Sequence, residues 1–184
     1  MDNTAQFLVV SARTFALFAL LIIATYTDIA YGRIYNWLVY PAIALGIILA
    51  ALGQVLDAGR PDIVESAEGL AAGAAIFGFF FLRGWMGAAD VKLAAAIGAL
   101  SGVWFFLWAL LFITLAGALI AVAVMIWSGT FGDSMKNSLV FFFRPKKLKE
   151  KMEASGQQPV MIPYGLAMAV GTMVAWFAWN VDLW

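Results

Sequence analysis

The stretch Ala16-Leu-Phe-Ala-Leu-Leu-Ile-Ile-Ala-Thr-Tyr-Thr-Asp28 decides the fold class, because it is uncharged until its last residue. With the residues before it, this run is long enough for a bilayer-spanning helix, which needs about 20 predominantly apolar residues. A second run opens on an acid, in Gly87-Ala-Ala-Asp90-Val-Lys-Leu-Ala-Ala-Ala-Ile97. An aspartate at the edge of a spanning helix is costly, so each of the two indicates a functional site.

The composition extends this interpretation to the whole chain. Of the 184 residues, 64% are hydrophobic and 12% are charged, whereas soluble domains are nearer half apolar and a quarter charged. The excess apolar residues must therefore face lipid. We predict an all-α polytopic membrane protein, with one transmembrane domain over residues 1–184 and little room for a separate soluble domain.

Several classes of site are excluded by the residues that the chain lacks. It contains no Cys and no His, which rules out disulfides, thiolate or imidazole metal sites, a Cys nucleophile and a Ser-His-Asp triad. The net charge is zero, so nothing indicates nucleic acid as a partner. Acid–base chemistry must come from carboxylates, Tyr or Lys, and no metal or cofactor is expected.

Hydropathy predicts six spans, at residues 7–27, 37–56, 66–83, 88–101, 103–127 and 161–181. The N-terminus lacks the basic region of a cleavable signal, so the first stretch is predicted to be a retained span. Ser101-Gly102 predicts a tight turn between an antiparallel pair of helices. Small residues at Gly69, Gly73 and Gly78, and at Gly98 and Gly102, predict close packing between spans.

The basic residues predict the orientation. Nine of the eleven lie in, or just after, the connections that follow the first, third and fifth spans: Arg33, Arg83, Lys92, Lys136, Arg144, Lys146, Lys147, Lys149 and Lys151. The positive-inside rule places this side in the cytoplasm, and both termini on the other side. Residues 128–160 are predicted to form a basic cytoplasmic loop. Its positive charges either serve only to orient the protein in the membrane or also bind anionic lipid.

This topology places Asp28 and Asp90 at the same depth, at the cytoplasmic ends of their spans. Arg13 lies roughly 22 Å along the helix from Asp28, and Lys92 points away from Asp90. Two adjacent carboxylates cannot both ionise easily, so one keeps its proton, as in aspartic proteases. Taken singly, each aspartate also has a structural explanation: a loop position for Asp28, and an N-cap for Asp90.

Three segments carry a resemblance to a known family. They are Asp28-Ile-Ala-Tyr-Gly-Arg33-Ile-Tyr-Asn36, Gly87-Ala-Ala-Asp90-Val-Lys-Leu93 and Ile162-Pro163-Tyr164-Gly165-Leu-Ala167. Over nearly its whole length, the chain resembles the type IV prepilin peptidases, the bacterial members of the Gly-x-Gly-Asp intramembrane aspartyl proteases. It is similar in particular to the short forms that serve tight-adherence (Flp) pilus systems.

The resemblance implies an aspartic endopeptidase of a bacterial inner membrane, with Asp28 and Asp90 as its catalytic residues. Its substrate would be a prepilin or pseudopilin, whose short basic leader is removed on the cytoplasmic side for pilus assembly or type II-like secretion. Longer relatives carry a cytoplasmic insert, often with paired cysteines, that is linked to N-methylation. This chain has neither, so N-methyltransferase activity is not expected.

One position departs from the family pattern. Gly87 matches the first glycine of the motif, but Ala89 stands where the family has glycine before the second aspartate. Glycine there would allow a close approach of backbone or substrate. The added methyl group is either tolerated or lowers activity.

Each of the remaining motif residues has two interpretations, one structural and one in which it shapes the site. Asn36 is predicted to N-cap the second span. Arg33 is an orientation charge or a contact to lipid or substrate. Lys92 is predicted to snorkel to the cytoplasmic surface, with a substrate role also open. Pro163-Tyr164-Gly165 either starts the last helix or also shapes the catalytic site.

Two other function classes compete with the protease. A small proton- or cation-coupled transporter would also use intramembrane carboxylates, but such proteins often show inverted repeats, and none is visible here. A catalytically impaired homologue acting in pilus assembly is the other alternative, and it rests on Ala89.

Overall fold

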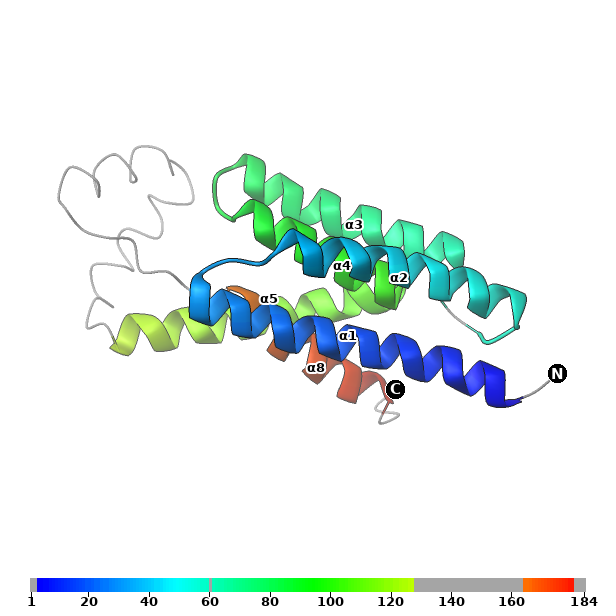
Figure 1. Ribbon diagram of the computed structural model, residues 1–184. Helices are drawn as coiled ribbons and strands as arrows, with labels where there is room; N and C mark the ends of the chain where they lie inside the picture. Colours follow the sequence, from blue (N-terminus) through cyan, green and yellow to red (C-terminus); the bar gives the residue numbers. More distant parts are fainter. Residues whose placement is uncertain (1–2, 60, 128–163, 181–184) are drawn as a thin grey trace.

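The structure, a computed structural model, describes residues 3–59, 61–127 and 164–180, which form six helices (Figure 1). Their bounds are α1 Asn3–Tyr31, α2 Asn36–Val55, α3 Ile63–Leu82, α4 Ala88–Ser101, α5 Val103–Trp127 and α8 Tyr164–Asn180. Successive helices run in alternate directions along a single bundle (Figure 1). The predicted all-α fold is confirmed, and each predicted span corresponds to one helix. The predicted basic loop at 128–160 lies outside the described residues.

Four of the described helices are long and apolar enough to cross a membrane. The candidate spans are Thr4–Tyr31 in α1, Asn36–Val55 in α2, Ile63–Leu82 in α3 and Val103–Val124 in α5. By contrast, α4 has 14 residues and α8, as described, has 17. These four helices indicate a multi-pass membrane protein. The count of six spans and the side of the membrane on which each terminus lies stay predictions.

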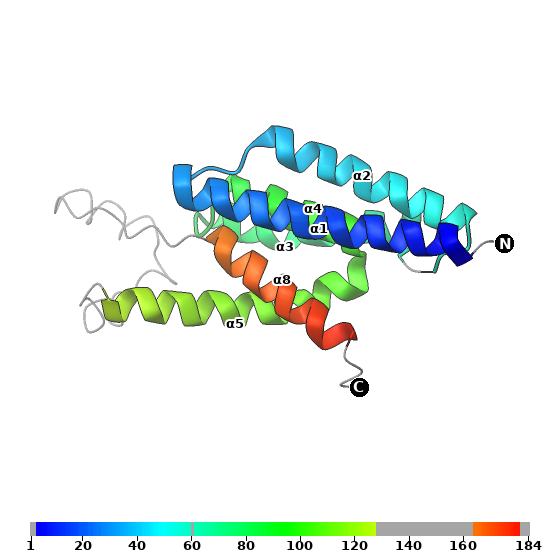
Figure 2. The same ribbon diagram turned by 60° about the horizontal axis from the view of Figure 1, so that its bottom comes forward.

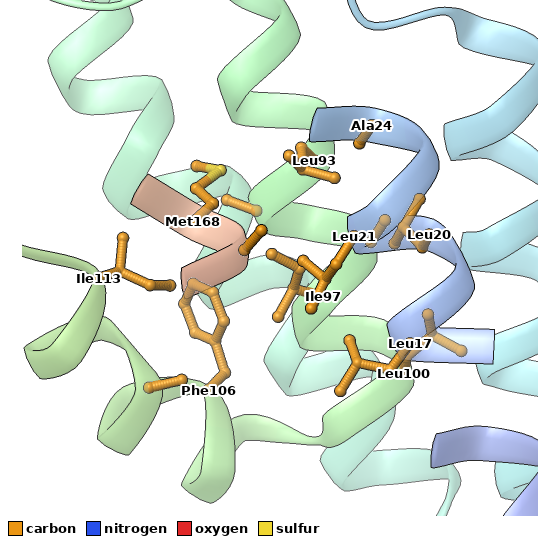
Figure 3. Close-up of a cluster of buried hydrophobic side chains, with 14 of the residues drawn as sticks. Leu17, Leu20, Leu21, Ala24, Leu93, Ile97, Leu100, Phe106, Ile113 and Met168 are labelled. Carbon is orange, nitrogen blue, oxygen red and sulfur yellow. The ribbon is translucent and has the colours of Figure 1, made fainter. Parts of the chain in front are cut away.

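Helix α4 occupies the centre of the bundle. All eight of its residues from Leu93 to Leu100 are buried, and it contacts each of the other five described helices. Figure 2 shows it between α2 on one side and α5 and α8 on the other. Its Leu93, Ile97 and Leu100 meet side chains of α1, α5 and α8 in the core (Figure 3). Because protein covers α4 on every side, it need not be as long or as apolar as a lipid-facing helix.

Small residues bring α3 and α4 into backbone contact, as their spacing predicted. A Cβ atom added to Gly98 would overlap the backbone oxygen of Gly69, and one added to Gly73 would lie 2.5 Å from the oxygen of Ala94. Across this interface, Ser66 Oγ donates a hydrogen bond to the Ala99 carbonyl at 2.5 Å. The exception is Gly78, which has no atom within 4 Å of an added Cβ, so it makes no close contact.

Replacing Gly98 by valine is expected to destabilise the fold by about 3 kcal/mol, the upper end of the usual cost of overpacking. The physical reason is that α3 and α4 must separate to admit the side chain. Gly78→Val is the matched control, because the same change there enters open space. Thermal unfolding in detergent measures the difference, and equal stability of the two variants would contradict the close packing.

The C-terminal end of α1 differs from the prediction. The predicted span stops at residue 27, but the helix continues through Asp28 to Tyr31. It stops at Gly32, which has a φ of +61° and donates its N–H to the Asp28 carbonyl at 2.8 Å. A hydropathy pattern breaks at the first charge, whereas a helix stops where glycine adopts the left-handed conformation. Asp28 is therefore a helical residue, and its loop interpretation was wrong.

Candidate active site

Asp28 lies in the last turn of α1, facing the first turn of α8. Its Oδ2 accepts a hydrogen bond from the backbone N–H of Gly165 at 2.9 Å. One turn earlier, Thr25 Oγ1 donates to the Gly165 carbonyl at 3.3 Å. The N-terminus of a helix offers unpaired N–H groups and the positive end of its dipole. The start of α8 is thus a suitable place to hold a carboxylate.

Gly165 is the residue that makes this contact possible. A Cβ atom at this position would lie 2.7 Å from Asp28 Oδ2, closer than non-bonded atoms approach, and 3.1 Å from Asp28 Cβ. Only glycine therefore lets the carboxylate sit against the backbone of α8. The sequence indicated a site-shaping role for this residue, and the geometry gives it a specific form.

Asp90 lies in the first turn of α4 and holds the start of its own helix. Its Oδ2 accepts the N–H of Gly87 at 3.1 Å, while the Asp90 N–H donates to the Gly87 carbonyl at 3.2 Å. Gly87 is the N-cap, with φ −80° and ψ 154°, so the predicted N-cap role of Asp90 was wrong. The carboxylate instead makes the return bond of a capping box.

The two aspartates are at the same end of the bundle. Helices α1, α4 and α8 contact one another pairwise, and the carboxylates of Asp28 and Asp90 interact electrostatically. Both side chains are half-buried. Within the described residues, both carboxylates accept hydrogen bonds from backbone N–H groups at helix starts, which lowers the cost of a charge in an apolar surrounding. Such a pair can hold one proton between two oxygen atoms and pass it to a reacting group.

Tyr164 forms a wall of the same site. It is half-buried and interacts electrostatically with Asp90. Its ring meets that of the fully buried Phe77 edge to face, with centroids 6.3 Å apart. Pro163, the other predicted residue of this segment, lies outside the described residues.

Lys92 and Asn36 pair with each other and not with the aspartates. Lys92 Nζ donates to Asn36 Oδ1 at 2.9 Å and lies 5.8 Å from the centre of the Tyr40 ring. Asn36 is the first residue of α2, whose N-cap is Tyr35, so the predicted capping role of Asn36 was wrong. This hydrogen bond joins the start of α2 to α4 at Lys92, two residues after Asp90 along the chain.

Arg33 and Ala89 are the other two predicted residues. Arg33 is exposed in the connection between α1 and α2, and both of its interpretations stay predictions. Ala89 is half-buried and packs against the apolar core beside Asp90. Among the described residues, no group of three or more Asp, Glu, His or Cys side chains could hold a metal ion.

Sequence reasoning missed Thr25 and Phe77. Thr25 could have been found, because it precedes Asp28 by three residues and shares its helix face. Phe77 gave no signal, since its contact with Tyr164 depends on how α3 and α8 pack.

A family model described as the type IV leader peptidase family matches residues 15–126. The match includes Asp28 and Asp90 and ends before Tyr164 and Gly165. No curated protein and no solved structure matches the chain.

Proposed function

The chain belongs to the type IV leader peptidase family, and we propose that it is an intramembrane aspartic endopeptidase for prepilins or pseudopilins. The family makes it a membrane peptidase of the leader-peptidase type. The observation that supports an aspartic mechanism is the adjacency of Asp28 and Asp90, held by the starts of two different helices. The bacterial inner membrane would be its location, and the tight-adherence pilus its most fitting system.

The proposed reaction uses the two carboxylates as a unit. One is ionised and takes a proton from a water molecule, whose oxygen attacks the scissile carbonyl carbon. The other is protonated and donates a hydrogen bond to the carbonyl oxygen, so that the pair stabilises the tetrahedral intermediate. Collapse of the intermediate breaks the C–N bond, and a carboxyl proton passes to the leaving amine. Each aspartate accepts a hydrogen bond from one backbone N–H group at a helix start, so the two carboxylates are held in similar ways. The proton is therefore assigned to the pair and not to one residue.

The side of cleavage follows from the charge pattern. Positive-inside counting puts the end of the bundle that carries Asp28 and Asp90 in the cytoplasm. A leader that is short and basic would remain on that side, next to the apolar helix that follows it. The proposed cut therefore falls between the leader and the substrate helix, without moving the helix out of the bilayer.

The experiment that tests this function is direct. The purified full-length chain is placed in liposomes with a prepilin that carries a basic leader, and the product is identified by mass spectrometry. Cleavage at the end of the leader is the expected result. Ion flux in the same liposomes without cleavage would instead support the transporter class.

Ala89→Gly is expected to change kcat/KM by less than about threefold. Ala89 sits in helical backbone, and the only described non-glycine residue with positive φ is Asp57, so alanine is not strained there. Glycine in a helix costs about 0.5–1 kcal/mol relative to alanine, so a small fall in thermal stability should accompany the change. If the wild-type protein does not cleave a prepilin and the Ala89→Gly variant does, the protein is the catalytically impaired homologue instead.

A further inference from the structure

Thr25 lies beside the candidate active site but takes no part in the proposed reaction. It is on α1 one helical turn before Asp28, so the two side chains share a face of the helix. Its Oγ1 donates a hydrogen bond to the Gly165 carbonyl at 3.3 Å, while Asp28 Oδ2 accepts the Gly165 N–H at 2.9 Å. Two side chains of α1 therefore hold both polar backbone groups of a single residue of α8.

The direction of the Thr25 hydroxyl is unusual for a threonine in a helix. Such a hydroxyl commonly bonds to the carbonyl three or four residues earlier in its own helix. Thr14, Thr27 and Thr114 do so, at distances of 2.8 to 3.1 Å. The hydroxyl of Thr25 instead crosses from α1 to α8. A bond within one helix leaves the neighbouring helices free to shift, whereas a bond between two helices fixes their relative position.

Two bonds to Gly165 fix more than one bond would. With the Asp28 contact alone, the start of α8 could turn about that single hydrogen bond. The second bond, from a residue three positions earlier on α1, also fixes the rotation of Gly165. The fit is close, because Gly165 is buried and an added Cβ would lie 2.7 Å from Asp28 Oδ2. The Gly165 N–H therefore points at Asp28 only while α8 keeps this orientation.

The residue before Gly165 extends the constraint to the second aspartate. Tyr164 interacts electrostatically with Asp90, and its ring packs edge to face against Phe77 of α3. The first turn of α8 thus meets both aspartates, Asp28 through Gly165 and Asp90 through Tyr164. A rotation of this turn would disturb both contacts at once.

We propose that Thr25 is a positioning residue of the peptidase, which holds the first turn of α8 so that the Gly165 N–H stays on Asp28. It acts through Gly165 and not on the substrate itself. A hydrogen bond to a carboxylate is strongest when the carboxylate is ionised, so a fixed N–H keeps Asp28 in place while the proton moves. The effect on rate rests on the proposed function, because it requires Asp28 and Asp90 to be the catalytic pair.

The first test is a set of three variants in the liposome assay with a prepilin. Thr25→Val keeps the branched shape and removes the donor, and its kcat should fall about tenfold, less than the 100-fold that a displacement of about 1 Å can cost. Its KM should stay within about twofold of the wild type, because the lost contact is not to the ground-state substrate. Thr25→Ser keeps the donor and should restore kcat. Thr27→Val is the matched control, since the Thr27 hydroxyl bonds within α1, and it should have the wild-type kcat.

The second test needs no substrate. In the full-length chain labelled with nitrogen-15 glycine, the Gly165 amide resonance is identified by its absence from Gly165→Ala. Its exchange with solvent should be about tenfold faster in Thr25→Val, the upper end of what one hydrogen bond contributes. Exchange in Thr25→Ser and Thr27→Val should match the wild type. A wild type that cleaves no prepilin, with exchange that still responds to Thr25→Val, would reject the peptidase function and support the hold of Thr25 on α8.

Three results would overturn the proposal. One is an active enzyme in which Thr25→Val has the wild-type kcat and the wild-type exchange of the Gly165 amide. Another is a raised KM with unchanged kcat, which would make Thr25 a contact to the substrate. The third is an equal loss of kcat in Thr27→Val, which would show that the bond between helices is not the cause. If Thr25→Val does not fold, Thr25→Ala removes the same donor with a smaller side chain, and the same outcomes decide.

Discussion

Replacing either Asp28 or Asp90 by asparagine should lower prepilin cleavage by about 100- to 10,000-fold, the range of a general acid–base contribution. Asparagine keeps an oxygen that can accept the N–H of Gly165 or Gly87, so the helix contacts survive while the shared proton is lost. Because the two carboxylates act as one unit, the double variant should be no slower than either single one. Initial rates of leader release in liposomes measure all three.

The control for these variants is Asp57→Asn. Asp57 lies in the connection between α2 and α3, is exposed and has a φ of 53°, a conformation that asparagine also tolerates. Its cleavage rate should equal that of the wild type. Rates within tenfold of the wild type for both Asp28→Asn and Asp90→Asn would exclude the carboxylate pair as the catalytic group.

Gly165→Ala should reduce kcat about 100-fold while leaving the fold intact. The new methyl group would meet Asp28 Oδ2, an atom at the free end of a side chain that can swing away. Its approach to Asp28 Cβ, at 3.1 Å, needs a shift of only a few tenths of an ångström, so little stability is lost. A displacement of about 1 Å is enough to cost 100-fold in rate when a reacting group must be oriented. The rate of leader release and the thermal unfolding temperature are measured on the same preparation.

Gly171→Ala separates this effect from ordinary crowding. A Cβ at Gly171 would overlap the backbone of Ile113 in α5, and a backbone cannot swing away as a side chain can. Gly171 lies six residues after Gly165 along α8, away from Asp28. We expect this variant to lose stability, and to lose less activity per folded molecule than Gly165→Ala. A Gly165→Ala enzyme with wild-type kcat would show that the contact between α8 and Asp28 is not needed for the reaction.

Much of this architecture follows from the residues themselves. Apolar runs gave the number and approximate bounds of the helices, and small residues at Gly69, Gly73 and Gly98 marked the interfaces where backbones touch. The basic residues fall in every second connection between spans, and this alternation placed Asp28 and Asp90 at one end of the bundle. Each of these signals is local, or depends only on a count along the chain.

The parts that sequence did not reveal depend on tertiary contacts. Asn36 carries the side chain of a good N-cap, but Lys92 binds its oxygen across the bundle, and Tyr35 takes the cap position. The burial of α4 on all sides was also hidden, because an Ala- and Gly-rich helix has nearly the same composition whether it faces lipid or protein. The fit of Gly165 against Asp28 joins residues 137 positions apart.

The pairing of α3 with α4 also fixes how deep the reaction lies. Gly73 faces Ala94, so Asp90, one helical turn before Ala94, is level with Phe77, about 8 Å short of the end of α3 at Leu82. Asp90 thus lies inward from the level at which α3 ends. In the proposed peptidase, the scissile bond of a substrate must therefore pass the end of α3 by about 8 Å before it meets this carboxyl group. The register of two glycine-packed helices, and not the aspartate itself, sets that depth.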